Sequence, residues 1–123
     1  MSWAPDPWEV VFYETGRGER PAEVWLRGQH VKVQARFAWI FDLLGEHGTK
    51  IREPYVAHLR GKLWEVRLEQ QGVQYRLLYF PGPRRRFVML HGFVKKTRRA
   101  PARELEVAEQ RMVDYLKRRG EEG

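Results

Sequence analysis

Two neighbouring strands expected from the sequence place two arginines face to face. Leu63–Glu69 alternates apolar and polar residues, and Val73–Phe80 follows it after a short break. If Gln71-Gly72 forms a two-residue turn, the pairing of the strands is fixed and Arg67 lies directly opposite Arg76. Like charges in this position repel by about 0.2–1 kcal/mol, so the arrangement favours an anion bound between them.

The same register gives the strand pair one apolar face. Its expected pairs are Trp64 with Tyr79, Val66 with Leu77, and Leu68 with Tyr75. A third strand, Phe87–Val94, is expected after the turn Pro81-Gly82-Pro83. If Val88, Leu90 and Val94 join the apolar face, then His91, Phe93 and Lys95 lie on the face of the two arginines.

This group of cations suits cleavage of RNA by attack of its own 2′-hydroxyl on the adjacent phosphate. Guanidinium groups stabilise the charge that develops on phosphate oxygens, which is the role expected for Arg67 and Arg76. Crowding lowers the pKa of a lysine, so Lys95 or Lys96 is a candidate for proton transfer, with His91 in reserve. The alternative is that the arginines are solvated strand residues paired with Glu65 and Glu69, and that His91 is structural.

The positive charge is concentrated in the middle of the chain. The formal net charge is +7, and residues 52–103 alone carry a net charge of +10, whereas both flanking segments are slightly acidic. Such a segment favours a polyanionic partner, although a solvated arginine-rich surface is the alternative. The candidate RNA-binding residues outside the catalytic group are Lys62, Arg84, Arg85, Arg86, Arg98 and Arg99.

Length and composition exclude several classes of protein. With 123 residues, we expect one domain over residues 1–123, with residues 120–123 as a disordered tail. The chain has no cysteine and its four histidines lack ligand spacing, so we expect neither a metal nor a cofactor. No apolar run approaches the roughly 20 residues of a membrane span. The first residues also lack the order of a signal peptide, and we therefore expect a cytoplasmic protein without a membrane partner.

The remaining pattern predicts an α+β domain in the order β-α-α-β-β-β-α, with one mainly antiparallel sheet covered by helices. Trp8–Glu14 is expected to form the first strand, because it is rich in β-branched and aromatic residues. Two helices follow, one over about Pro21–Leu26 and one from about Val31 that ends near Gly45 or Gly48. The last helix opens at Pro101.

Residues 58–103 resemble the RelE/HigB-type toxins of bacterial toxin–antitoxin systems, and are closest to their phage-derived HigB-like branch. Three segments carry the resemblance in order, namely Leu63–Arg67 (LWEVR), Tyr75–Tyr79 (YRLLY) and Leu90–Thr97 (LHGFVKKT). The Pro101 helix follows them in the expected place. The combination of these elements is more specific than any one of them.

The resemblance implies a compact RelE-like toxin that enters the ribosomal A site and cuts translated mRNA. It also implies a cognate antitoxin, often a helix-turn-helix protein. By resemblance, Arg76 contacts the scissile phosphate, and Arg67 and Lys96 occupy the basic positions on the preceding strand and after the final strand. Two positions depart from RelE, since Glu65 stands where RelE has a lysine and Ala102 where it has a tyrosine.

Other functions remain open at this point. A relative on the same fold poisons DNA gyrase through protein contacts, and a phage-derived protein that only binds nucleic acid or a partner fits the same charge pattern. A degenerate toxin is a further alternative. For the toxin, we expect Arg76→Ala to abolish growth arrest while leaving the fold intact.

Overall fold

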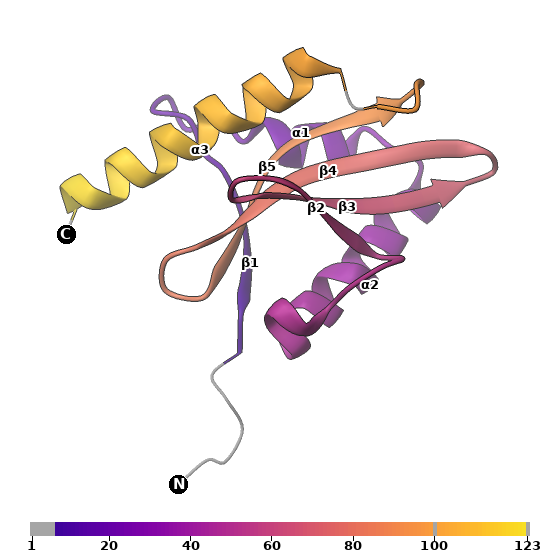
Figure 1. Ribbon diagram of the computed structural model, residues 1–123, viewed down its shortest axis with the longest axis horizontal. Helices are drawn as coiled ribbons and strands as arrows, with labels where there is room; N and C mark the ends of the chain where they lie inside the picture. The colour runs from indigo at the N-terminus through magenta and orange to yellow at the C-terminus, as the bar shows by residue number, and fades with distance from the viewer. Residues whose placement is uncertain (1–6, 100, 123) are drawn as a thin grey trace, which may run out of the picture.

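The computed structural model describes residues 7–99 and 101–122 and has the α+β architecture expected from the sequence (Figure 1). Over these residues a five-stranded sheet is accompanied by three α-helices. The elements in order are β1 (Glu9–Phe12), α1 (Pro21–Arg27), α2 (Val31–His47), the short 3-10 helix η1 (Gly48–Lys50), β2 (Val56–Arg60), β3 (Leu63–Gln70), β4 (Val73–Gly82), β5 (Arg86–Lys95) and α3 (Ala102–Glu122).

The sheet has the strand order β1-β5-β4-β3-β2. Strand β1 runs parallel to β5, and every other neighbouring pair is antiparallel. The strand β2 was not predicted from the sequence. A signal for it exists, because a two-residue loop that begins with Gly61, at φ 55°, joins β2 to β3 in a tight hairpin.

The expected register of β3 and β4 is confirmed. Gln70 pairs with Val73 around the Gln71-Gly72 turn, and Arg67 pairs with Arg76. Both turn residues have positive φ, at 50° and 78°, which is the backbone conformation of the two-residue hairpin turns that match the twist of the strands. The turn therefore sets the position of the two arginines.

Helices cover both faces of the sheet, and each face has its own core. On one face, α1 and α2 pack on the apolar residues of β3, β4 and β5, with Phe37, Val66 and Leu77 fully buried. On the other face, α3 packs on β4 and β5 around Leu78, Phe80 and Leu90. Figure 1 shows α3 crossing one side of the sheet while α2 lies on the opposite side.

A β-bulge in β5 overturns part of the predicted face pattern. Leu78 pairs with His91 and Tyr79 pairs with Met89, so Leu90 is an extra residue in β5. The inserted residue shifts the alternation by one. Val88 and Leu90 therefore pack with the α3 core and not, as predicted, with Leu77 and Tyr79. Beyond the bulge the prediction holds, because Val94 pairs with Tyr75 on the α1 and α2 side.

Helix α1 approaches the sheet closely at Gly92. The indole of Trp25 lies over this position, and a Cβ built on Gly92 would be 2.1 Å from Trp25 Cε3. Because the bulge turns residue 92 toward α1, only a glycine leaves room for the indole. Packing of α1 on β5 thus depends on the same irregularity that orients His91 and Phe93.

Helix α3 is held to the sheet by polar contacts as well as by its core. The Tyr13 hydroxyl donates a hydrogen bond of 2.6 Å to Asp114, and Arg111 Nη1 donates one of 2.8 Å to the carbonyl of Leu90. The helix continues to Glu122, and Gly123 lies outside the described residues. Across residues 7–99 and 101–122, no helix has the length and apolar character needed to cross a membrane.

Candidate functional site

The two facing arginines share a carboxylate of their own chain. Glu65 precedes Arg67 by two residues on β3, so both side chains leave the strand on the same face. Its Oε1 atom lies 3.6 Å from Nε of Arg76 and 3.7 Å from Nε of Arg67. Glu65 is only 5% exposed. This contact is the pairing with Glu65 that the sequence offered as the alternative to a bound anion.

Arg76 is almost completely removed from solvent, with 3% of its surface exposed. Its Nη1 atom donates a hydrogen bond of 2.9 Å to the carbonyl of Tyr75, and its Nη2 atom donates one of 3.3 Å to Gln74. Burial lowers the pKa of Arg76 from that of a free arginine, while the nearby charge of Glu65 opposes this effect. The guanidinium is therefore a fixed, oriented charge rather than a mobile surface group.

Arg67 is the accessible member of the pair. Its side chain is 38% exposed, and its Nη1 atom lies 3.4 Å from Glu53, in the segment before β2. Glu53 itself is 72% exposed, so this ion pair faces water and is weak. An incoming anion can replace Glu53 at Arg67 at little cost.

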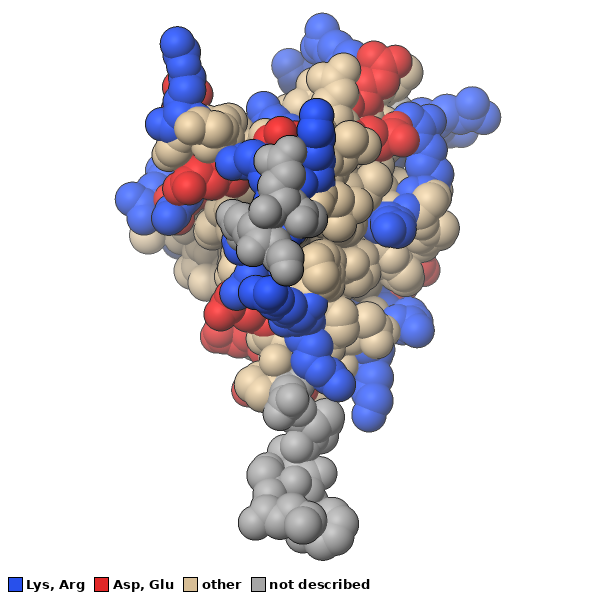
Figure 2. Space-filling view, turned by 90° about the vertical axis from the view of Figure 1, so that its left-hand side faces the viewer, with Lys and Arg blue, Asp and Glu red and all other residues tan. Residues whose placement is uncertain are grey.

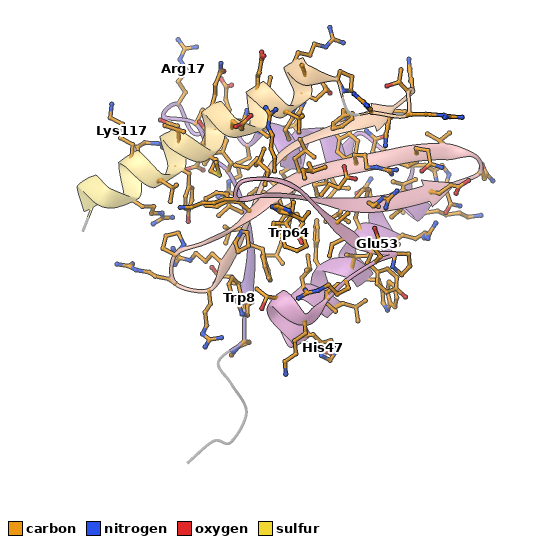
Figure 3. The ribbon with its side chains drawn as sticks, viewed as in Figure 1. Trp8, Arg17, His47, Glu53, Trp64 and Lys117 are labelled. Atoms are coloured by element: carbon orange, nitrogen blue, oxygen red, sulfur yellow. The ribbon has the colours of Figure 1, made fainter. Side chains whose placement is uncertain are left out.

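Both arginines line a groove of about 330 Å³ at the edge of β3. Strand β2 pairs with only the first half of β3, which leaves the edge beyond Arg67 uncovered. Helix α2 forms the opposite wall, and Glu53, labelled in Figure 3, comes from the segment that leads into β2. The groove lining consists of Arg36, Trp39, Ile40, Glu53, Pro54, Tyr55, Arg67, Leu68, Glu69, Gln74 and Arg76.

Helix α2 contributes groove residues that the sequence analysis did not identify. Arg36 Nη1 donates to the carbonyl of Glu69 and, over 3.0 Å, to the side chain of Gln70. Trp39 lies one turn further along the same helix and is 51% exposed. A spacing of three residues indicates that the two side chains share one side of a helix. The sequence alone does not show that this side meets the arginines of the sheet.

The lysines and arginines after β5 lie at the same end of the sheet as the groove. Lys95 pairs with Gln74, and on β4 Gln74 and Arg76 point to the same face. Lys95 is partly buried there, and the residues after it, Lys96, Arg98 and Arg99, are exposed. The structure thus places Lys95 on the same face of the sheet as Arg76, and Lys96, Arg98 and Arg99 follow it in the chain.

The other predicted RNA-binding residues lie at the opposite end of the sheet. Lys62 is in the turn between β2 and β3, and Arg84, Arg85 and Arg86 are in or next to the turn between β4 and β5. Figure 1 shows these two turns on one side of the molecule and the β3–β4 turn on the other. Arg86 is also paired with Glu9 at 3.3 Å. The face that carries the β4–β5 turn shows cations interspersed with acids (Figure 2).

His91 lies beneath the first turn of α3 and both of its ring nitrogens have protein partners. Nε2 is 3.2 Å from Glu104 and Nδ1 is 3.3 Å from Nη1 of Arg111. Since Arg111 can only donate, Nδ1 accepts and the proton of neutral His91 is on Nε2. Burial lowers the pKa of His91, with Glu104 raising it and Arg111 lowering it further. These contacts favour the structural alternative for His91.

Metal ligands do not gather in the part of the chain that the structure describes. Over residues 7–99 and 101–122, no group of three or more His, Asp or Glu side chains is arranged to hold an ion. The arrangement instead offers oriented guanidinium groups, two exposed carboxylates and an aromatic wall. This combination can hold a phosphate and move a proton.

Comparison with known protein families gives a match over most of the chain. The family described as phage derived protein Gp49-like (DUF891) matches residues 24–113. The matched segment begins within α1 and ends within α3, and it includes every residue that lines the groove. No curated protein shows a significant match to the chain.

Proposed function

The chain belongs to the Gp49-like family of phage-derived proteins, a RelE/HigB-like toxin family of toxin–antitoxin systems, and we propose that it is the toxin that cleaves mRNA on the ribosome. Within that family we assign it to the HigB-like branch. The observation that carries the proposal is the pairing of Arg67 with Arg76 beside a groove that opens at the edge of the sheet. A cognate antitoxin is the partner that the toxin family implies.

The groove arginines and the lysines at the end of β5 together suit the steps of cleavage by the 2′-hydroxyl. The hydroxyl oxygen attacks the adjacent phosphorus and the bond to the 5′-oxygen breaks, leaving a cyclic phosphate and a free 5′-hydroxyl. Arg67 holds a phosphate oxygen after displacing Glu53, and the buried charge of Arg76 stabilises the phosphorane behind it. Lys95 or Lys96 accepts the proton of the 2′-hydroxyl and then donates a proton to the departing 5′-oxygen, and none of these steps requires a metal ion.

One observation favours a second candidate, a protein that binds nucleic acid and cuts nothing. The arginines of the groove are offset by carboxylates, since Glu65 lies against both strand arginines and Glu53 against Arg67. The groove therefore stabilises a phosphorane less than the count of cations suggests, while the exposed Lys96, Arg98 and Arg99 can still bind phosphates. The experiment below separates the two candidates.

The test is a reconstituted translation reaction in which the 5′ ends of the mRNA are mapped. We expect cuts in translated message and none in naked mRNA incubated in parallel. Arg67→Gln removes an accessible charge-assisted hydrogen bond worth about 1.5–3 kcal/mol, so cleavage should slow by roughly 10- to 150-fold. Lys95→Gln and Lys96→Gln, compared with each other, identify the lysine that exchanges the proton.

Arg84→Gln is the matched control, because it removes the same charge from the far end of the sheet. It should cut at nearly the wild-type rate. Equal losses in Arg67→Gln and Arg84→Gln would reject the groove as the site. No cuts in either message, from protein whose fold is intact, would favour the binding protein, and a DNA supercoiling assay then tests for gyrase poisoning.

A further inference from the structure

Trp39 is about half exposed on a side of α2 that does not form the core. The core side of α2 is formed by Val33, Phe37, Ile40 and Leu44, which are buried. Among the described residues, the other large hydrophobic side chains with comparable exposure are all valines. Trp39 is 51% exposed and lines the groove that contains Arg67 and Arg76.

A second aromatic residue holds Trp39 in place. Its ring lies 5.3 Å from that of Tyr55, at an interplanar angle of 76°. In an edge-to-face pair of this kind, at most one face of the indole is used. The exposed half of Trp39 thus leaves ring surface at the groove wall that a planar ligand can contact.

The other groove residues define the chemistry of that ligand. Arg67, the accessible arginine of the pair, can bind an anion, whereas Glu53, Glu69 and Gln74 offer acceptors for N–H or O–H groups. A volume of about 330 Å³ is at the lower end of the range for small-ligand sites, roughly 300–1,000 Å³. A single nucleotide fits that volume and has the required features, which are a planar base, hydrogen-bond donors and a phosphate.

We propose that Trp39 stacks on the base of the single-stranded RNA nucleotide whose phosphate is held by the groove arginines. This rests on the proposed function, in which that RNA is the substrate, and it adds the residue that selects for an unpaired base. Aromatic side chains stack on every base, so Trp39 contributes affinity and positioning without sequence readout. A docked protein helix fits less well, because it needs a contiguous apolar groove and the apolar lining of this one is interrupted by Arg36, Glu53 and Arg67.

The experiment measures binding of a short single-stranded RNA by fluorescence anisotropy, alongside an abasic strand with the same number of phosphates. Trp39→Ala should bind the normal RNA roughly 5- to 150-fold more weakly than wild type, the range for loss of one stacked base. Binding to the abasic strand should not change, because that strand offers phosphates alone. Trp39→Phe should retain most of the affinity.

Val31→Ala is the matched control, since Val31 is 69% exposed on the same helix and does not line the groove. If Trp39→Ala loses the same affinity for both RNA strands, or loses none for either, the proposed role of Trp39 is overturned. Binding of a protein partner would then be the better explanation of this surface. Cleavage of translated message by Trp39→Ala at the wild-type rate would then show that the proposed function stands without it. Failure of the wild type to bind RNA even at low salt, with no cleavage on the ribosome, would overturn both proposals.

Discussion

The buried pair of Glu65 and Arg76 should make the fold sensitive to the loss of either partner, and replacing one of them alone should reveal this. The two side chains are 6% and 4% exposed, and the atoms Oε1 and Nε are 3.6 Å apart. At an effective dielectric constant of about 20, unit charges at that distance attract by about 4–5 kcal/mol. Removing one partner of such a pair typically costs about 3–5 kcal/mol, because a charge remains buried without its counterion.

Arg67 moderates this loss for one of the two variants. When Arg76 is replaced by glutamine, Glu65 retains Arg67 at 3.7 Å, so the cost should lie near the lower end, at about 3 kcal/mol. Replacing Arg67 by glutamine should cost less than about 1 kcal/mol, since its side chain is 38% exposed and water screens its charge. The two arginines therefore contribute very differently to the free energy of unfolding, although they face each other.

Urea unfolding of a double-mutant cycle measures the pair directly. With a slope of about 2 kcal/mol per molar urea, Arg76→Gln should lower the midpoint by roughly 1.5 M. Glu65→Gln combined with Arg76→Gln should cost at least about 2 kcal/mol less than the sum of the single changes. A coupling below about 0.5 kcal/mol, with unchanged slopes, would refute the argument that this buried pair holds the sheet at the site.

This stability effect changes how a loss of toxicity is interpreted. The sequence led us to expect that Arg76→Ala leaves the fold intact, but burial of Arg76 against Glu65 weighs against that expectation. A loss of about 3 kcal/mol is a large part of the 5–15 kcal/mol that stabilises an ordinary domain. Arg67→Gln is the better functional test because its cost in stability is small.

Two further predictions concern the elements that support the site. Gly92→Ala should lower the free energy of unfolding by roughly 1–3 kcal/mol, because the new Cβ would lie 2.1 Å from Trp25 and α1 must shift. Urea unfolding measures this loss. An unchanged midpoint would mean that the indole moves freely. Burial of His91 under α3 lowers its pKa, with Glu104 opposing this and Arg111 adding to it. Because the unfolded chain then binds the proton more readily, stability should fall as the pH drops below about 6.5, and His91→Gln should flatten this dependence between pH 7.5 and 5.5. An equally steep fall in the variant would assign the pH dependence to other groups.

Local signals in the sequence were sufficient for the centre of the sheet. The Gln71-Gly72 turn fixes which residues of β3 and β4 pair, because the two strands are adjacent in the chain and only one register buries their apolar face. Arg67 opposite Arg76 follows from that register alone. Helical periodicity and the proline and glycine positions likewise predicted α1, α2 and α3 to within a few residues.

Only the tertiary structure decided what surrounds the arginine pair. The bulge at Leu90 reverses the faces of half of β5, and no local rule marks where an extra residue will be accommodated. Burial of Glu65, and the approach of Arg36 and Trp39 from α2, depend on packing between segments some 30 residues apart. The turns also send Arg84 to the far end of the sheet from Lys95, although both belong to one cationic segment.

The physical reason is the range of the interactions involved. Turn geometry and side-chain alternation are properties of a few consecutive residues, so the sequence determines which residues face each other within a hairpin. Which charge is buried, which is paired and which stays open to a ligand depends on where distant segments come to lie, and that is decided when helices and strands pack into one core.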